Sequence, residues 1–127
     1  MNLNQITLEV TDLDRSIEFY RAMGLKLIVS SGNPYARFEL PEGDATLSLH
    51  VVDEPPKPGG VRIYFEVSDV AEQVRDLQEK GVQFETLPTK QRWLWTEAWF
   101  SDPDGHRLCI FSAGENRKNP PWRLNDS

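Results

Sequence analysis

The chain of 127 residues has the length of one domain, a formal net charge of −6 at pH 7, and a single cysteine. No basic cluster stands out, so nucleic acid is not an expected partner. One cysteine excludes an internal disulfide, which is typical of a reducing compartment. The first residues lack the basic and apolar segments of a secretory leader, and no apolar run reaches membrane-spanning length. We therefore expect a cytoplasmic protein without a membrane partner.

Two stretches repeat each other at a constant offset of 57 residues, the separation of Asp12 and Asp69. Each reads as an alternating strand, an aspartate, apolar residues at helical spacing, and a glycine. Asp12 and Asp69 are expected to cap the helices by accepting hydrogen bonds from first-turn N–H groups. Gly24 and Gly81 are expected to end them in the left-handed conformation.

In chain order, the pattern predicts two βαβββ modules. Module one (1–52) is predicted as a strand over 2–10, a helix over 14–23, and strands over 25–30, 36–40 and 46–51. A Pro- and Gly-rich linker follows at 53–60. Module two (61–113) is predicted as a strand over 61–67, a helix over 71–80, and strands over 83–86, 95–101 and 107–112. The tail 114–127 is expected to be irregular, with Trp122 holding it to the body.

The last two strands are joined by the turn sequence Asp-Pro-Asp-Gly. Pro103 presets the backbone φ that a turn requires, and Gly105 supplies the positive φ. A hairpin is therefore predicted here, with Cys109 in the middle of its second strand.

Alternation in the strands gives each sheet one apolar face and one polar face. The polar set is Gln5, Thr7, Glu9, Ser48, His50, Arg62, Tyr64 and Glu66, and in the last strand Arg107, Cys109 and Phe111 lie opposite Leu108 and Ile110. From this pattern alone, the polar face is expected to lie open to water, as in many antiparallel sheets.

The doubled module, with "DLDRSIEFYRAMGLKL" early and "SDPDGHRLCIF" late, resembles the vicinal oxygen chelate superfamily over about residues 3–113. That superfamily includes glyoxalases, fosfomycin-resistance proteins, extradiol dioxygenases and bleomycin-resistance proteins. The resemblance implies an α+β fold, in which two paired βαβββ modules form curved sheets around a cleft. It also implies a small-molecule ligand and a homodimer.

Metal-dependent members hold a divalent ion with side chains from the first and last strands of each module. The resemblance places those positions on Gln5, Ser48, Arg62 and Cys109. A guanidinium cannot ligate a metal, and its charge repels one. We therefore expect no cofactor, and a divalent metal is disfavoured.

Two residues are candidates for catalysis. An imidazole titrates near neutral pH, so His50 is a candidate general acid or base; the alternative is a hydrogen-bonded pocket histidine. Cys109 is a candidate nucleophile if its pKa is depressed, for which Arg62 is the neighbour available. The alternative is an inert, small hydrophobic residue.

The candidate ligand-binding residues share the polar face or an aromatic segment; they are Gln5, Ser48, Arg62, Tyr64, Glu66, Glu97 and Trp99. Arg62 suits an anionic group, unless it forms a salt bridge to Glu9 or Glu66. In "WLWTEAWF" the resemblance to the fosfomycin group places Glu97 and Trp99 at pocket positions. The alternative is that this segment packs beneath the tail.

Two functions from different classes follow. One is a metal-free protein that binds a small molecule in its cleft, like the bleomycin-resistance members. The other is a metal-dependent lyase, isomerase or dioxygenase of the glyoxalase type with an altered ligand set. The altered ligand positions, the net charge of −6 and the tryptophan cluster favour the first.

Overall fold

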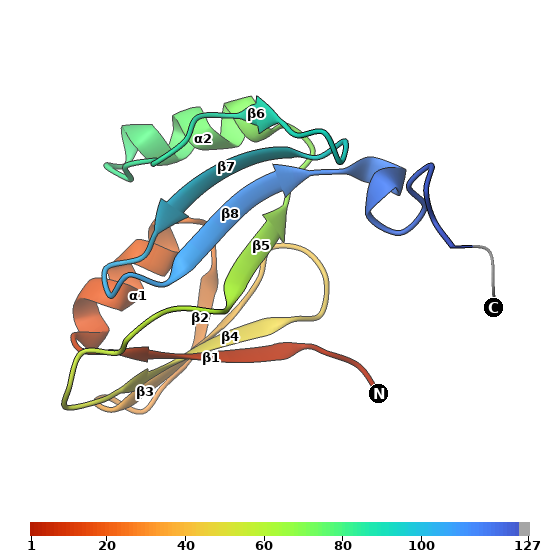
Figure 1. The fold of residues 1–127 in the computed structure, drawn as a ribbon. Coiled ribbons are helices and arrows are strands. Elements are labelled where there is room, and N and C mark those ends of the chain that lie inside the picture. Colours follow the sequence, from red (N-terminus) through yellow and green to blue (C-terminus); the bar gives the residue numbers. More distant parts are fainter. Residues whose placement is uncertain (125–127) are drawn as a thin grey trace. The chain divides into compact units, whose positions relative to one another are not determined.

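The first four strands of the chain form one four-stranded sheet, and the first helix lies between the first two of them in sequence (Figure 1). In this computed structural model, which describes residues 1–124, they are β1 (Gln5–Val10), α1 (Leu13–Ala22), β2 (Lys26–Ser30), β3 (Tyr35–Glu39) and β4 (Thr46–Val51). The strand order of this sheet, sheet A, is β1-β4-β3-β2. The β1–β4 pair is parallel and the other pairs are antiparallel.

The same topology recurs in sheet B. Its elements are β5 (Arg62–Glu66), α2 (Val70–Glu79), β6 (Thr89–Lys90), β7 (Thr96–Ser101) and β8 (Arg107–Ser112), in the order β5-β8-β7-β6. A short 3₁₀ helix, Gly114–Arg117, follows β8. The predicted α+β fold of two βαβββ modules is confirmed.

Both helices begin and end within one residue of the predicted ranges. The side chain of Asp12 accepts a hydrogen bond from the Arg15 backbone N–H, and that of Asp69 from the Glu72 N–H. Gly24 and Gly81 have φ values of 96° and 93°, in the left-handed region that glycine tolerates best.

Each helix covers one face of its own sheet. Helix α1 packs against β2, β3 and β4, and α2 runs along β7 and β8 (Figure 1). The fully buried side chains include Tyr20, Phe38 and Leu49 in α1 and sheet A, and Leu77, Phe100 and Leu108 in α2 and sheet B. Leu49 and Leu108 lie on the apolar strand faces that the alternation predicts, and Tyr20 and Leu77 lie on the apolar helix faces that the helical spacing predicts.

The chain forms two compact units, and the division departs from a simple split at the linker. The first unit comprises Met1–Gly60 together with Asp102–His106, and the second comprises Val61–Ser101 and the residues after His106. The hairpin turn between β7 and β8 thus belongs to the unit that contains sheet A. Gly105 in this turn has the predicted positive φ, 91°.

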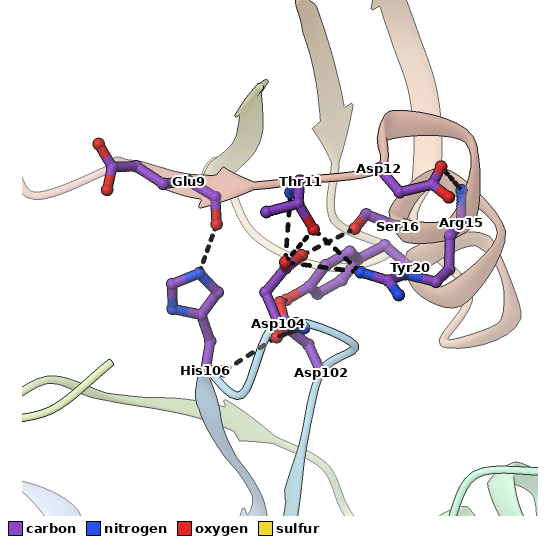
Figure 2. A network of polar contacts seen from close by, with 9 residues as sticks. All are labelled: Glu9, Thr11, Asp12, Arg15, Ser16, Tyr20, Asp102, Asp104 and His106. Carbon is purple, nitrogen blue, oxygen red and sulfur yellow. Dashed lines mark hydrogen bonds and ion pairs between the residues drawn. The ribbon is translucent and has the colours of Figure 1, made fainter. Parts of the chain in front are cut away.

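Hydrogen bonds fix this turn against β1 and α1 (Figure 2). The hydroxyl of the buried Tyr20 donates to Asp102 Oδ2 over 2.7 Å, and Asp102 Oδ1 accepts from two backbone N–H groups of the turn. Asp104 Oδ1 accepts from the backbone and hydroxyl of Thr11, and His106 Nε2 lies 2.7 Å from the Glu9 carbonyl oxygen. The Asp-Pro-Asp-Gly sequence therefore forms the turn and also provides side chains that are hydrogen-bonded to Thr11 and to Tyr20 of α1.

The strand predicted over 83–86 is absent. Only Phe84 bridges to Phe100, and the regular pairing with β7 begins at β6. The Thr86 hydroxyl accepts from the backbone N–H of Trp99 over 3.0 Å, and so occupies the donor that a paired strand would use.

The tail differs from expectation at Trp122. Its side chain is 56 % exposed. The start of the tail is instead attached through Trp95, whose Nε1 donates a hydrogen bond to the Asn116 carbonyl oxygen over 3.4 Å. None of the helices within residues 1–124 has both the length and the apolar character needed to cross a membrane.

Candidate functional site

One face of sheet B carries most of the predicted ligand-binding residues, and we call it the Arg62 face. The strand register aligns its side chains in three rows across β5, β8 and β7: Arg62, Arg107 and Ser101; Tyr64, Cys109 and Trp99; Glu66, Phe111 and Glu97. Residues of one row are cross-strand neighbours, so their side chains are close enough to interact. Arg62, Tyr64, Glu97, Trp99 and Cys109 are therefore brought together.

Aromatic rings fill the middle of the Arg62 face. Tyr64 meets Trp95, Trp99 and Phe111 edge-on, with ring centroids 5.8, 5.3 and 5.5 Å away. Trp95 stacks on Phe111 at 4.7 Å. Edge-to-face and stacked contacts of this kind add to the burial energy of the rings. The Tyr64 side chain is nevertheless 40 % exposed, so it offers surface for a ligand.

Glu97 organises two of the tryptophans. Its side chain is only 3 % exposed, and its two oxygens accept from Trp93 Nε1 at 2.7 Å and Trp99 Nε1 at 3.0 Å. A buried carboxylate needs such donors, since an unpaired charge in the interior is costly. Because both oxygens are engaged by indoles, Glu97 positions the aromatic side chains and is poorly placed to bind a cationic ligand itself.

Two guanidinium groups lie over the ring of Trp99. The Cζ atoms of Arg62 and Arg107 are 5.9 and 5.2 Å from its centroid, within the range of cation–π attraction. Arg107 also pairs with Glu85, whereas no ion pair of Arg62 is found within residues 1–124. Glu66, the partner considered for Arg62 on this sheet, lies 3.8 Å from Arg117 instead. The positive charge of Arg62 is therefore not neutralised by an ion pair within the described residues.

Burial raises the pKa of Tyr64 above its usual value, and the negative charge of Glu97 adds to this rise. The hydrogen bond and charge of Arg62 act in the opposite direction and are outweighed. Tyr64 therefore stays a neutral hydroxyl at physiological pH. In that state it can both donate and accept a hydrogen bond.

Cys109 lies beneath the aromatic rings, in a small apolar cluster with Phe111 and Ala113. Burial raises the pKa of its thiol to about 12, with the charge of Glu97 as the second cause. A thiol with that pKa is protonated at neutral pH and is a poor nucleophile. These properties favour the small-hydrophobic interpretation of Cys109 over the catalytic one.

The matching face of sheet A, which we call the Ser48 face, brings Gln5 and Ser48 into direct contact. Gln5 Nε2 donates to Ser48 Oγ over 2.8 Å. The same oxygen lies 2.6 Å from the Tyr35 hydroxyl, and Arg37 Nε donates to that hydroxyl over 2.9 Å. The hydrogen bond from Ser48, together with Arg37, lowers the pKa of Tyr35 despite some desolvation.

Sequence reasoning did not select Tyr35 or Arg37. The sequence predicts this strand over 36–40, with Tyr35 outside it, whereas β3 begins at Tyr35. The signal was present, because Ala36 and Phe38 are buried and the alternating Tyr35, Arg37 and Glu39 share the opposite face. His50 is an exposed residue of the same face and is in register with both Glu9 and Tyr35. Its proposed catalytic role stays a prediction.

The donor chemistry at the family's metal-ligand positions does not fit a divalent ion. Ser48 is a buried neutral hydroxyl that is already hydrogen-bonded, Arg62 is a cation, and Cys109 is a buried thiol with a raised pKa. Within residues 1–124, no group of three or more His, Cys, Asp or Glu side chains is arranged to hold a metal.

Comparison with known proteins identifies the superfamily to which this fold belongs. The profile of the glyoxalase/bleomycin resistance protein/dioxygenase superfamily matches residues 2–110. The chain belongs to this superfamily. Its βαβββ repeat, the two N-capping aspartates and the Asp-Pro-Asp-Gly hairpin are the features on which the resemblance rests.

Individual relatives agree with this assignment. The uncharacterized protein YraH of Bacillus subtilis (strain 168) is 32 % identical over 127 aligned positions, covering 87 % of this chain and 98 % of that protein. A glyoxalase/bleomycin resistance protein/dioxygenase from Nocardioides superposes with a TM-score of 0.78 at 23 % identity, covering 98 % of this chain and 90 % of the other. A bleomycin-binding protein complexed with bleomycin superposes with a TM-score of 0.69 at 23 % identity, over 88 % of this chain and 98 % of that one.

Proposed function

We propose that the protein binds a small organic molecule on the Arg62 face, without a divalent metal. The observation that carries this proposal is the unneutralised guanidinium of Arg62 beside the half-exposed Tyr64 and the ring of Trp99. A guanidinium offers several donors to a carboxylate or phosphate, and aromatic edges suit a planar or apolar group. The preferred ligand is therefore an anion that carries an aromatic or apolar part.

Membership of a superfamily that includes bleomycin resistance proteins supports a binding function. The donor set at the metal positions supports the metal-free alternative over a metal-dependent lyase, isomerase or dioxygenase. The single cysteine agrees with a cytoplasmic location.

Replacing Arg62 with alanine is expected to weaken binding of an anionic aromatic ligand by about ten- to a hundred-fold. The reason is that a hydrogen bond to a charged group is worth roughly 1.5–3 kcal/mol. Such a ligand would be found by a thermal-shift screen of aromatic carboxylates, and its affinity measured by calorimetry. Arg62→Lys should restore only part of the affinity, since an ammonium lacks the planar fork.

Two controls accompany this measurement. Arg75→Gln removes an exposed guanidinium from α2 and should leave affinity unchanged. Chelator in the buffer should not alter the ligand's stabilising effect, and elemental analysis should show no stoichiometric metal. An affinity indifferent to Arg62→Ala would refute the proposed site, and loss of binding in chelator would favour the metal-dependent alternative.

We also propose that the protein is a homodimer, as the resemblance to two-module members implies. Closed two-fold dimers are the commonest oligomers, and Trp122 leaves a large apolar surface exposed near the end of the chain. Light scattering at micromolar concentration should report twice the chain mass. A monomer at that concentration would contradict the proposal.

A further inference from the structure

A chain of hydrogen bonds crosses the Ser48 face, from β3 through β4 to β1. Arg37 Nε donates to the Tyr35 hydroxyl, which lies 2.6 Å from Ser48 Oγ, and Gln5 Nε2 donates to that same oxygen. Ser48 is fully buried, whereas Tyr35 and Arg37 are partly exposed. The middle of this chain, at Ser48, is thus closed to water, whereas the end formed by Tyr35 and Arg37 is open.

The direction of the bond between Tyr35 and Ser48 follows from counting donors. Gln5 Nε2 also lies 3.0 Å from the Ile6 carbonyl oxygen and 3.1 Å from the Thr7 hydroxyl, so its two hydrogens are shared among three acceptors. A carbonyl can only accept, so the atom that faces Ser48 is the amide nitrogen, which cannot itself accept. In this orientation the Gln5 oxygen accepts from the Thr46 hydroxyl. Ser48 therefore cannot donate to Gln5.

Among the side-chain contacts of residues 1–124, the Tyr35 oxygen is the remaining acceptor for the hydroxyl hydrogen of Ser48. A buried hydroxyl hydrogen without an acceptor costs free energy, so Ser48 donates to Tyr35. The Tyr35 oxygen then accepts two hydrogen bonds, one from Ser48 and one from Arg37. Its own hydrogen is left without a partner at the open end of the chain.

Arg37 adds positive charge at the same place. Its Cζ lies 5.4 Å from the centroid of the Tyr35 ring, so the guanidinium stays beside the hydroxyl. Within the described residues no carboxylate pairs with Arg37, and only its Nε is engaged. One oriented O–H donor and free guanidinium N–H groups therefore converge on one spot. That arrangement is suited to stabilise negative charge on oxygen.

We propose that Tyr35 and Arg37 form an oxyanion-binding site on the Ser48 face, which takes the anionic oxygen of a small organic ligand such as a phenolate or a carboxylate. Ser48 and Gln5 are positioning residues, because they direct the Tyr35 hydrogen outward and do not contact the ligand. This site uses none of the residues of the site proposed on the Arg62 face.

The test uses 4-nitrophenolate as the probe, at a pH where the phenol is ionised. Its parent protein is the Arg62→Ala variant, because the site proposed on the Arg62 face takes the same class of ligand. The parent protein should give a saturable shift of the probe's absorption band, since a hydrogen bond to the oxyanion changes its electronic spectrum. Tyr35→Phe and Arg37→Gln should each weaken binding by about ten- to a hundred-fold. Ser48→Ala should weaken it by about two- to ten-fold and reduce the spectral shift, because the Tyr35 hydrogen loses its fixed direction.

Arg21→Gln is the matched control, since it removes an exposed guanidinium from α1 and should leave binding unchanged. Far-UV circular dichroism establishes that each variant is folded. Displacement of the probe by benzoate is expected, and displacement by inorganic phosphate alone would overturn the organic ligand class. The proposal also fails if the parent gives no saturable shift, if folded Tyr35→Phe binds as tightly as the parent, or if Arg21→Gln weakens binding equally.

Discussion

Replacing Asp102 with alanine is expected to lower the free energy of unfolding by about 3–5 kcal/mol. Asp102 is 5 % exposed and accepts three hydrogen bonds, from the Tyr20 hydroxyl and from the backbone N–H groups of Asp104 and His106 (Figure 2). Alanine leaves the fully buried Tyr20 hydroxyl without its acceptor and releases the turn from α1. Each buried donor that loses its partner costs about 1–3 kcal/mol.

Urea denaturation followed by circular dichroism measures this loss. Asp76→Ala, at an exposed position of α2, should stay within about 0.5 kcal/mol of the parent. Asp102→Asn should fall between the two, because its amide oxygen still accepts from the turn while its nitrogen can only donate toward Tyr20. A loss below about 1 kcal/mol in Asp102→Ala would show that the turn contributes little to stability.

The pH dependence of Tyr20→Phe gives a further control on the same contact. Burial, followed by the charge and hydrogen bond of Asp102, holds the pKa of Tyr20 well above its usual value. The unfolded chain therefore loses this proton first, near pH 10. The stability that Tyr20 contributes is complete below that pH and is lost as pH rises toward its folded-state pKa. The stability advantage of the parent over Tyr20→Phe should accordingly shrink above about pH 10.

Features that depend on neighbouring residues could be predicted from the sequence. The caps at Asp12 and Asp69, the helix ends at Gly24 and Gly81, and the turn at Gly105 each rest on a local conformational preference. The repeat then supplied the topology, because the same local signals recur in the same order. The predicted strand over 83–86 is absent because the Thr86 hydroxyl, in place of a backbone carbonyl, accepts from the N–H of Trp99, and this contact is not local.

Features that depend on distant partners could not be predicted in this way. The contact of Tyr20 with Asp102 joins residues 82 positions apart, and no periodicity in either segment indicates it. Glu97 was selected as a ligand-binding residue, yet its partners are the indole N–H groups of Trp93 and Trp99. Alternation shows which face a side chain occupies, but it does not show which hydrogen-bond partners the side chain already has. Those partners determine which polar atoms remain available to a ligand.

Replacing Glu97 with alanine is expected to lower the free energy of unfolding by about 2–4 kcal/mol. The change removes a buried carboxylate and leaves two indole N–H groups without their acceptor. Trp93 is 40 % exposed and can turn its N–H to water, so the larger share of the cost falls on Trp99. Tryptophan fluorescence should shift to longer wavelength as these rings become hydrated.

Glu97→Gln separates the hydrogen bonds from the space that the side chain fills. A glutamine of the same shape offers one acceptor and one donor group, so one indole N–H then faces another N–H. We expect a loss of about 1–3 kcal/mol in urea denaturation, against a change within about 0.5 kcal/mol for Glu18→Ala on the exposed face of α1. If Glu97→Gln is as stable as the parent, the two indole bonds do not hold the Arg62 face together. Its order would then rest on ring packing alone, above all on the stacking of Trp95 against Phe111.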